Sequence, residues 1–425
     1  MAHDLRLHME MKRTSLMVSN AVGLCFFLNG CVLKSGKQVR HEVPALYSAS
    51  APEFRQSAGS LLGPNFVAGN NVVTLVNGQQ IFPAMLSAIR SAKRSVTFET
   101  YIFSDGEIAK QFTDALAERA RAGVKVHAIL DAHGTRPMGN ENLRKLRAAG
   151  VEVVKYHSIY WIDVRRYNNR THRKLLIVDG KTAFIGGVGI ANEWTGNADS
   201  PKHWRENHYK ITGPVVAQMQ AAFMTNWLKT RGQLLHGADY FPPLQSTGPY
   251  LAQAIRSSAR NANLDTMYLL AIASARKTLL IENAYFLPDE LTRQELIAAA
   301  KRGVKIEIIV PGKHIDQRVV RAASKRHWPD LLTTGIKIYE YQPTMVHVKL
   351  LVVDDAFVSV GSGNFDNRSV RLNDEANLDV LDRQFAVEQA RLFEKDKRQS
   401  REMTLDPAGK LHPINQAAGL ASPQL

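Results

Sequence analysis

Two histidine–lysine pairs occur in the sequence with the same spacing, and their side chains suit phosphoryl transfer. Residues 172–179 read HRKLLIVD and residues 347–354 read HVKLLVVD, so both copies follow the pattern H-x-K-x4-D. A neutral imidazole is nucleophilic near pH 7, and a second imidazole can protonate an alkoxide leaving group. Two ammonium groups would hold the phosphoryl charge during displacement, so neither a metal nor another cofactor is expected. The candidate catalytic residues are His172, Lys174, Asp179, His347, Lys349 and Asp354.

Each copy of the pattern predicts a buried strand that ends in a turn, because apolar residues fill the interval between Lys and Asp. Side chains alternate along a strand, so the His and Lys of each copy share one face. Burying an imidazole beside an ammonium without a partner would be costly, and this face must therefore meet something anionic. Asp179 and Asp354 have the opposite parity, which favours a structural role for them over a catalytic one.

Small and polar residues follow both copies at matching positions, namely Gly187 in the first copy and Ser362 with Asn364 in the second. Small residues let backbone N–H groups approach a phosphate, and Asn364 could donate a hydrogen bond to a non-bridging oxygen. Farther along, Glu206 and Glu375 each enter another predicted strand. Either carboxylate could accept from the distal nitrogen of its histidine and fix the tautomer, the alternative being a solvated turn carboxylate.

The composition describes a globular protein with an anionic partner. The chain has 425 residues, of which 45% are hydrophobic and 22% charged, and this is enough for two domains of ordinary size. A formal net charge of +15 indicates either nucleic acid or a phospholipid surface, which composition does not separate. Cys25 and Cys31 are the only cysteines, so the body of the chain has no disulfide and no cysteine metal site.

The first 31 residues resemble an export signal. Lys12 and Arg13 precede the apolar segment 16–28, which is too short to span a bilayer. This segment ends in Leu-Asn-Gly-Cys31, similar to the lipobox of bacterial lipoproteins, where cleavage leaves a cysteine that carries lipid. We therefore expect a lipoprotein lipidated at Cys31 and anchored in the cell envelope facing the periplasm, with an uncleaved anchor as the alternative. Residues 32–65 lack a sustained period and are interpreted as a tether.

From Phe66 onward, strands and helices are predicted to alternate. Strands are expected at 72–76, 95–103 and 124–130, helices at 81–92 and 107–122, and a turn at Asn77-Gly78. Alternation of this kind predicts an α/β fold with a largely parallel sheet.

The second half repeats the first. Residues 122–126 (AGVKV) match 302–306 (RGVKI), and residues 150–153 (GVEV) match 335–338 (GIKI). We predict two duplicated domains, at 66–235 and 236–400, packed as an intramolecular pseudo-two-fold unit that brings the two His-Lys pairs together. The tail, 401–425, is expected to be loosely ordered and without chemistry.

The doubled motif with its trailing GG or GSxN resembles the phospholipase D superfamily, and the stretches ETYIF, WRENH and VGSGNFDNRSVRLNDEANL resemble its bacterial cardiolipin synthase branch. The similarity covers roughly residues 66–400. It implies two tandem phospholipase D-like α-β-α sandwich domains and a covalent phosphohistidine intermediate, with His172 as the nucleophile and His347 as the general acid. Gly189 departs from the family pattern, because many relatives have there an Asn equivalent to Asn364.

These features predict a phosphatidyltransferase that forms cardiolipin from phosphatidylglycerol or a related donor at a membrane surface. A phospholipase D, or a phosphodiesterase or nuclease, would use the same residues with water as the acceptor and is the alternative. The export signal disfavours nucleic acid as the partner. Two intact His-Lys pairs disfavour a non-catalytic lipid-binding lipoprotein.

Overall fold

The computed structural model describes residues 44, 45, 47–157 and 168–414. The chain divides into two compact units, Met1–His41 and Glu42–Leu425, and every described residue belongs to the second. The predicted signal peptide, Cys31 and the first part of the predicted tether therefore lie outside the described residues. Within the described residues, no helix is long and apolar enough to cross a membrane.

Sixteen strands of the described residues form one mixed sheet. From edge to edge they are β16 (Leu411–Pro413), β15 (Ser400–Leu405), β11 (Lys337–Tyr341), β10 (Lys305–Pro311), β9 (Thr278–Asn283), β12 (Lys349–Val353), β13 (Phe357–Gly361), β14 (Glu375–Leu381), β8 (Tyr250–Ser257), β1 (Val67–Val76), β7 (Asn207–Thr212), β6 (Thr182–Gly186), β5 (Leu175–Val178), β2 (Ser95–Thr100), β3 (Lys125–Asp131) and β4 (Glu152–Tyr156).

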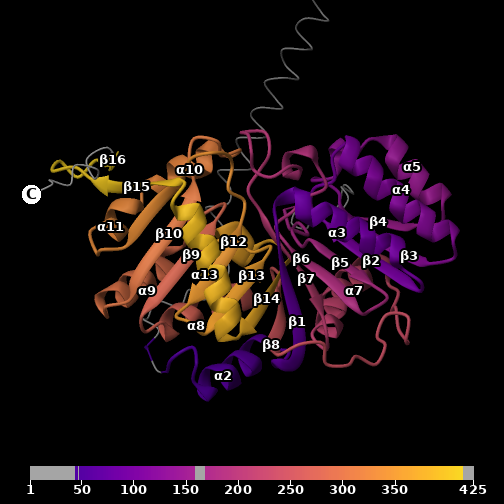
Figure 1. The fold of residues 1–425 in the computed structure, drawn as a ribbon, viewed down its shortest axis with the longest axis horizontal. Coiled ribbons are helices and arrows are strands. Elements are labelled where there is room, and N and C mark those ends of the chain that lie inside the picture. Colours follow the sequence, from indigo (N-terminus) through magenta and orange to yellow (C-terminus); the bar gives the residue numbers. More distant parts are fainter. Residues whose placement is uncertain (1–43, 46, 158–167, 415–425) are drawn as a thin grey trace, which may run out of the picture. The chain divides into compact units, whose positions relative to one another are not determined.

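The strand order repeats about the antiparallel pair formed by β8 and β1 at the centre of the sheet. Moving outward, β14 corresponds to β7, β13 to β6, β12 to β5, β9 to β2, β10 to β3 and β11 to β4. Figure 1 shows the two halves on either side of β1 and β8. The predicted duplication is therefore present as two halves of one continuous sheet.

The prediction of a largely parallel sheet is wrong. Strands β2, β3 and β4 pair in parallel, as do β9, β10 and β11, but the other pairings are antiparallel. Parallel neighbours need a long crossover, which here contains a helix. Each His-Lys strand is instead followed by a short turn and its hairpin partner, β6 or β13, and this fixes antiparallel pairing around the motifs.

Helices cover both faces of the sheet, as an α-β-α sandwich requires. One layer contains α7 and α13, whose apolar residues share a continuous core with alternate strand residues of both halves. The other layer packs α3 and α4 on the first half, and α2, α8 and α9 on the second. The helices are α2 (Pro52–Leu62), α3 (Asn77–Ser91), α4 (Glu107–Arg121), α5 (Asn140–Ala148), α7 (Val216–Arg231), α8 (Asn263–Ser274), α9 (Glu290–Lys301), α10 (Arg318–Lys325), α11 (Trp328–Leu332), α12 (Asn367–Arg371) and α13 (Arg383–Lys397), with short 3-10 turns η2 (Arg136–Met138) and η3 (Asn192–Trp194).

The strands of the two motifs show why their sequences are apolar throughout. Leu175 and Ile177 of β5 belong to the core under α7, whereas Leu176 and Val178 belong to the core under α3 and α4. A strand buried on both faces needs a continuous apolar run. Each motif strand therefore runs through the buried centre of its half, and the residues at its ends are held in fixed positions.

The described parts of the predicted tether and of the predicted tail contain regular structure, which corrects the predicted domain limits. Helix α2 lies inside the predicted tether and buries Phe54 and Leu62 against the second half. The predicted tail begins with β15 and β16, which extend the sheet beyond β11. Both segments are rich in polar residues, and a few well-spaced apolar side chains are enough for them to pack on an existing core.

Residues 77 and 78 were predicted to be a turn, but they begin helix α3. Asn77 has a backbone φ of 60°, in the left-handed region that Asn tolerates better than most residues. The chain therefore changes direction at Asn77 and continues directly as a helix.

We expect Phe54→Ala to destabilise the protein by about 3 to 5 kcal/mol, because it would leave a cavity under α2. Phe54 is 1% exposed, and its ring lies edge-on to Phe357 with 5.1 Å between ring centroids. Leu61→Ala on the same helix is the matched control, since Leu61 is 60% exposed. Equal losses of melting temperature in the two variants would show that α2 does not contribute to the stability of the second half.

Candidate active site

Each histidine of the motifs lies just before its strand, in a segment that the opposite half of the molecule holds. The backbone N–H of His172 donates to the carbonyl of Asp374 at 2.9 Å, and that of His347 donates to the carbonyl of Arg205 at 2.7 Å. Arg205 in turn forms a buried ion pair with Asp396 of α13, with 2.7 Å between nitrogen and oxygen. Each half therefore fixes the backbone position of the histidine that belongs to the other half.

Each imidazole ring is oriented by a carboxylate that belongs to the opposite half of the molecule. Nδ1 of His172 lies 2.9 Å from both carboxylate oxygens of Glu375, and Nδ1 of His347 lies 2.6 Å from Oε2 of Glu206. The sequence interpretation identified both carboxylates but assigned each to the histidine of its own copy, which is wrong. Since Nδ1 is engaged in both rings, Nε2 is the nitrogen that remains for chemistry.

The two lysines complete one buried cluster with the histidines. Lys174 Nζ donates to the carbonyl of His172 at 2.7 Å, and Lys349 Nζ lies 3.0 Å from Nδ1 of His347. Burial lowers the pKa of Lys174 to about 7 and the pKa of Lys349 to about 8, against the attraction of carboxylates from both halves. Each lysine lies within electrostatic reach of Glu375, so the two motifs meet in a single site.

The surroundings of both histidines favour their neutral forms. Burial, opposed by Glu375, lowers the pKa of His172 to about 4. Burial and the two ammonium groups hold the pKa of His347 well below its usual value. A neutral imidazole is the form that can attack phosphorus, and an anionic phosphate entering the site would favour protonation of the second ring.

The two carboxylates have different surroundings. Ser362 donates to Glu375 at 2.5 Å, and Ser369 donates to its other oxygen at 2.8 Å. In the first half, Gly187 stands in the place of Ser362, and a Cβ there would lie 2.2 Å from Oε2 of Glu206. Gly187 was predicted to let a backbone N–H group approach a phosphate, but its small size instead makes room for the Glu206 carboxylate.

These surroundings separate the pKa values of the two carboxyls. Burial alone would raise the pKa of Glu375, but His172, Lys174 and the hydroxyl donors hold it below its usual value. Burial raises the pKa of Glu206 to about 7, against the attraction of Lys349. Glu375 is thus the more firmly ionised carboxylate, and it faces His172.

Asn364, predicted to donate to phosphate, is buried behind the Glu375 carboxylate. Its Nδ2 lies 3.5 Å from Oγ of Ser369. The corresponding Gly189 has no room for an Asn side chain, because a Cβ there would lie 2.8 Å from Ile102 and 3.0 Å from the ring of Trp194. The departure from the family pattern at Gly189 therefore follows from packing in the first half.

The two motif aspartates are not part of the site. Asp179 accepts hydrogen bonds from the backbone N–H groups of Lys93, Arg94 and Ser95 at the start of β2. Asp354 accepts from the corresponding groups at residues 276–278, at the start of β9. Both residues hold the left-handed turn at the far end of the motif strand, so their inclusion among the catalytic candidates is corrected to a structural role.

Aromatic side chains that the sequence interpretation did not select surround the histidines. The ring of His347 lies 5.3 Å from Trp194, 5.5 Å from Trp204 and 6.3 Å from Tyr285, between centroids. The ring of His172 lies 5.3 Å from Tyr101. The repeated ETY and ENAY segments could have indicated the two tyrosines. The tryptophans have no counterpart in the repeat, although Trp204 begins the stretch WRENH that resembles the cardiolipin synthase branch.

A family model described as cardiolipin synthase, phospholipase D-like domain, matches residues 85–227 and 268–397. The chain is 31% identical over 348 residues to probable cardiolipin synthase YwiE of Bacillus subtilis (strain 168), covering 81% of this chain and 69% of that one. It is 34% identical over 358 residues to cardiolipin synthase A of Pseudomonas putida (strain W619), covering 82% and 73%.

The fold is similar to the crystal structure of phosphatidylserine synthase from Haemophilus influenzae Rd KW20, with a TM-score of 0.65 at 14% identity, covering 82% of this chain and 92% of that one. Together with the family match, the fold and the doubled motif place the chain in the phospholipase D superfamily. Within it, the chain belongs to the cardiolipin synthase-like branch and is an enzyme of the phospholipid phosphatidyltransferase type.

The raised pKa of Glu206 predicts a pH-dependent cost to stability. Between its unfolded pKa, near 4.5, and about 7, the folded protein keeps a proton that the unfolded chain has lost, so stability falls as pH rises through this range. The loss should be roughly 3 kcal/mol and should be absent in Glu206→Gln. Melting temperatures of both proteins at about pH 5 and about pH 8 would measure it.

Glu375→Gln is the matched control for this measurement. The lowered pKa of Glu375 keeps it ionised at both of these pH values, so its substitution should change the melting temperature by the same amount at each. A pH-independent effect of Glu206→Gln, equal to that of Glu375→Gln, would contradict the asymmetry of the two carboxyls.

Proposed function

We propose that the protein forms cardiolipin from phosphatidylglycerol or a related phosphatidyl donor, through a phosphohistidine intermediate. The observation that carries the proposal is the exchange of partners, in which each half supplies the carboxylate that orients the other half's histidine. This arrangement makes one site with two neutral imidazoles and two lysines. Such a site can carry out the displacement at phosphorus in two steps, in which one histidine holds the phosphoryl group between them.

In the first step, Nε2 of His172 attacks the phosphorus of the donor, and the P–O bond to the departing alcohol breaks. His347, which the bound anionic phosphate keeps in its protonated form, gives this alcohol a proton from Nε2 as it leaves and becomes neutral. The two carboxylates support these roles. The ionised Glu375 stabilises the positive charge that develops on His172. Glu206, whose pKa is about 7, suits the carboxyl beside His347, because His347 exchanges protons with the alcohols.

In the second step, His347 takes the proton of an incoming alcohol, whose oxygen attacks the phosphohistidine and breaks the P–N bond. Lys174 and Lys349 supply positive charge beside the phosphoryl group in both steps. Burial lowers the pKa values of both lysines, and an anionic phosphate beside them would favour their charged forms. Water in place of the alcohol would give hydrolysis.

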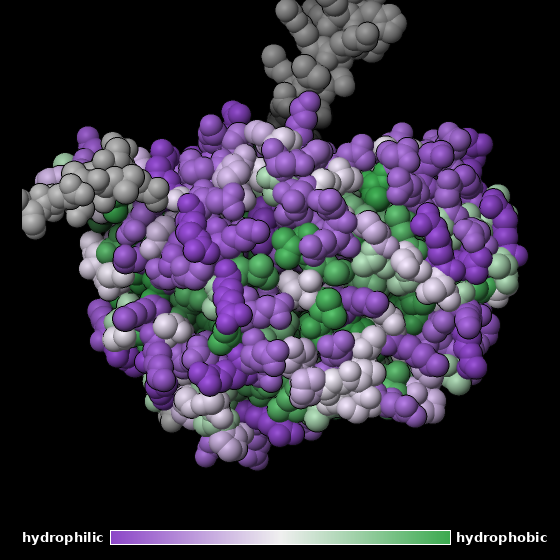
Figure 2. Space-filling view, viewed as in Figure 1, coloured by the Kyte–Doolittle hydropathy of each residue, from purple (hydrophilic) through white to green (hydrophobic). Residues whose placement is uncertain are grey.

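We also propose that the enzyme works at an anionic membrane surface on the periplasmic side, anchored through Cys31. The net charge of +15 supports attraction to such a surface. Helix α10 exposes Arg318 and Val319, the latter 66% exposed, and Arg326 follows the helix. The surface around α10 in Figure 2 is mainly hydrophilic.

The proposed function predicts that purified enzyme converts phosphatidylglycerol into cardiolipin and glycerol. With a phosphatidyl p-nitrophenyl ester, whose leaving group needs no proton, His347→Ala should still form a phosphatidyl-enzyme, whereas His172→Ala should form none with any donor. The measurements are lipid product analysis and trapping of the intermediate by acid quench. The matched control is Asp355→Ala, an alteration in a turn that takes no part in the chemistry.

Three outcomes would contradict parts of this proposal. Phosphatidate as the sole product would show hydrolysis and reject the transferase. An intermediate trapped in His172→Ala but not in His347→Ala would reverse the two roles. Full activity without any trapped intermediate in the unaltered enzyme would reject covalent catalysis.

The proposed anchor predicts that the mature protein begins at Cys31 and carries acyl chains there. Cys31→Ser should leave the protein unprocessed or released from the membrane, because the modified residue is both the cleavage point and the site of the lipid. Mass spectrometry of the N-terminal peptide, with Cys25→Ser as the control, tests this. An intact N-terminus on the unaltered protein would refute it.

A further inference from the structure

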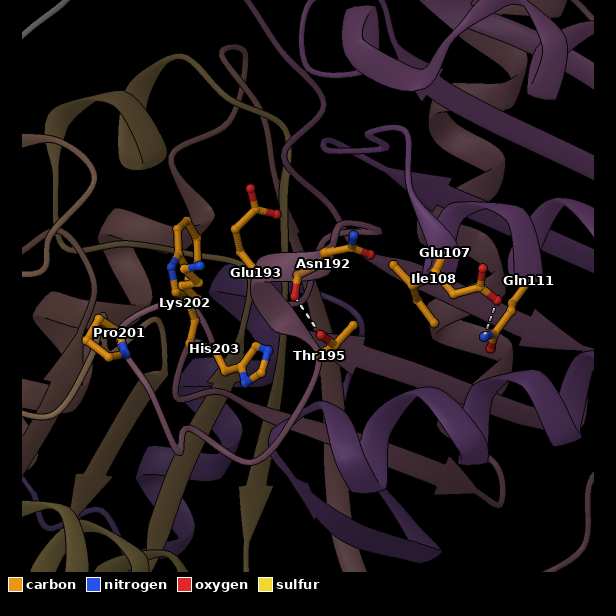
Figure 3. Close-up of a pocket in the computed structure, with 10 residues that line it drawn as sticks. Glu107, Ile108, Gln111, Asn192, Glu193, Thr195, Pro201, Lys202 and His203 are labelled. Atoms are coloured by element: carbon orange, nitrogen blue, oxygen red, sulfur yellow. Dashed lines mark hydrogen bonds between the residues drawn. The ribbon is translucent and has the colours of Figure 1, made fainter.

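A pocket of about 680 Å³ lies beside the reaction site, on the side of His347. Figure 3 shows Lys202 and His203 on one side of the pocket and Glu107 of helix α4 on the other, with Glu193 of η3 between them. Lys202, Glu107 and Glu193 are exposed, so solutes have access to the pocket.

The pocket and the active site share one side chain. Trp204 lines the pocket, and its ring lies 5.5 Å from the ring of His347. Trp194 of η3 packs edge-on to Trp204 at 4.5 Å and also contacts His347. No comparable pair of tryptophans lies against His172, whose aromatic neighbour among the described residues is Tyr101. The pocket therefore adjoins the histidine that exchanges protons with alcohols.

We propose that this pocket binds the phosphoglycerol headgroup of the acceptor alcohol, an inference that rests on the proposed transfer function. The ammonium of Lys202 provides donors for the acceptor's own phosphodiester. The carboxylates of Glu107 and Glu193 accept hydrogen bonds from hydroxyl groups. A polyol phosphate offers both kinds of group, whereas water and simple alcohols lack the anion.

The assignment sets a requirement on the position of the acceptor. The attacking hydroxyl must lie at Nε2 of His347, and in phosphatidylglycerol a three-carbon glycerol separates that hydroxyl from the phosphodiester. The glycerol would pass along the indole of Trp204, so that the phosphodiester reaches Lys202. The oxygen then forms its bond to the phosphorus on His172, the P–N bond breaks, and the proton goes to His347.

The loop that forms one side of the pocket is held in place before any ligand arrives. Nδ1 of His203 lies 2.5 Å from Asp199, and the N–H of Trp204 donates to the carbonyl of Glu193 at 2.6 Å. Gly196 has a φ of +72°, and a Cβ there would lie 2.6 Å from Nδ1 of His203, so only Gly permits this packing. A preformed pocket reduces the ordering cost of binding.

The pocket also gives a reason for transfer to prevail over hydrolysis. Binding energy from the acceptor's phosphodiester would hold the hydroxyl beside His347, where a water molecule has no such support. The indole rings of Trp194 and Trp204 pack against each other and against His347, and they give this imidazole an apolar neighbour. Selection of the acceptor would then depend on residues that take no part in the chemistry of the donor step.

The test uses the full-length enzyme with a phosphatidyl p-nitrophenyl ester as the donor. Two soluble acceptors are compared, glycerol and its phosphodiester glycerophosphoglycerol, and the ratio of transfer product to phosphatidate is measured for each. Lys202→Glu should lower the ratio for glycerophosphoglycerol about tenfold relative to that for glycerol, and Lys202→Ala should lower it about threefold. The single-turnover burst of nitrophenolate reports the donor step and the integrity of the fold.

Lys110→Glu is the matched control, because Lys110 lies on the same helix as Glu107, is 67% exposed and does not line the pocket. It should leave both ratios unchanged. The acceptor site would be overturned if Lys202→Glu had the same product ratios as the unaltered enzyme, or if its ratio fell equally for both acceptors. Either result would leave the proposed transferase activity in place. Phosphatidate as the sole product of the unaltered enzyme with both acceptors would instead reject the transferase and the acceptor site together.

Discussion

The exchange of carboxylates between the two halves is the interaction on which the rest of the site depends. His172 is oriented by Glu375, and His347 by Glu206, so neither half has a complete catalytic histidine by itself. Buried histidine–carboxylate pairs keep their geometry only where the surrounding structure fixes both partners. The continuous sheet, joined at β1 and β8, provides that constraint and makes the duplicated chain a single enzyme.

Small differences between the halves allow a symmetric fold to perform asymmetric chemistry. Ser362 and Ser369 hold Glu375 in its ionised form, whereas Gly187 leaves Glu206 without hydroxyl donors at the matching position. The proposed mechanism uses this difference to separate nucleophile from acid. Among the described residues, tryptophans lie against His347 and not against His172, and the proposed acceptor site lies on the His347 side.

Charge is used in two distinct ways in this structure. Buried pairs such as Arg205 with Asp396 hold backbone segments that carry the histidines, and their ionic groups are fixed. Exposed basic residues supply the long-range attraction to an anionic surface that the proposed function requires. The lysines of the motifs are a third case, because they are buried beside the histidines and supply positive charge to the phosphoryl group in the proposed reaction.

The sequence by itself determined the doubled motif, the duplication, the two orienting carboxylates and the chemistry, because spacing along a strand fixes which side chains share a face. It also placed β2, β3, α3 and α4 of the first half within a few residues. Only the tertiary structure decided that the carboxylates are exchanged, that α2 and β15 join the core, and that tryptophans line one histidine. These features arise from contacts between residues more than fifty positions apart, and local periodicity contains no information about which distant surfaces meet.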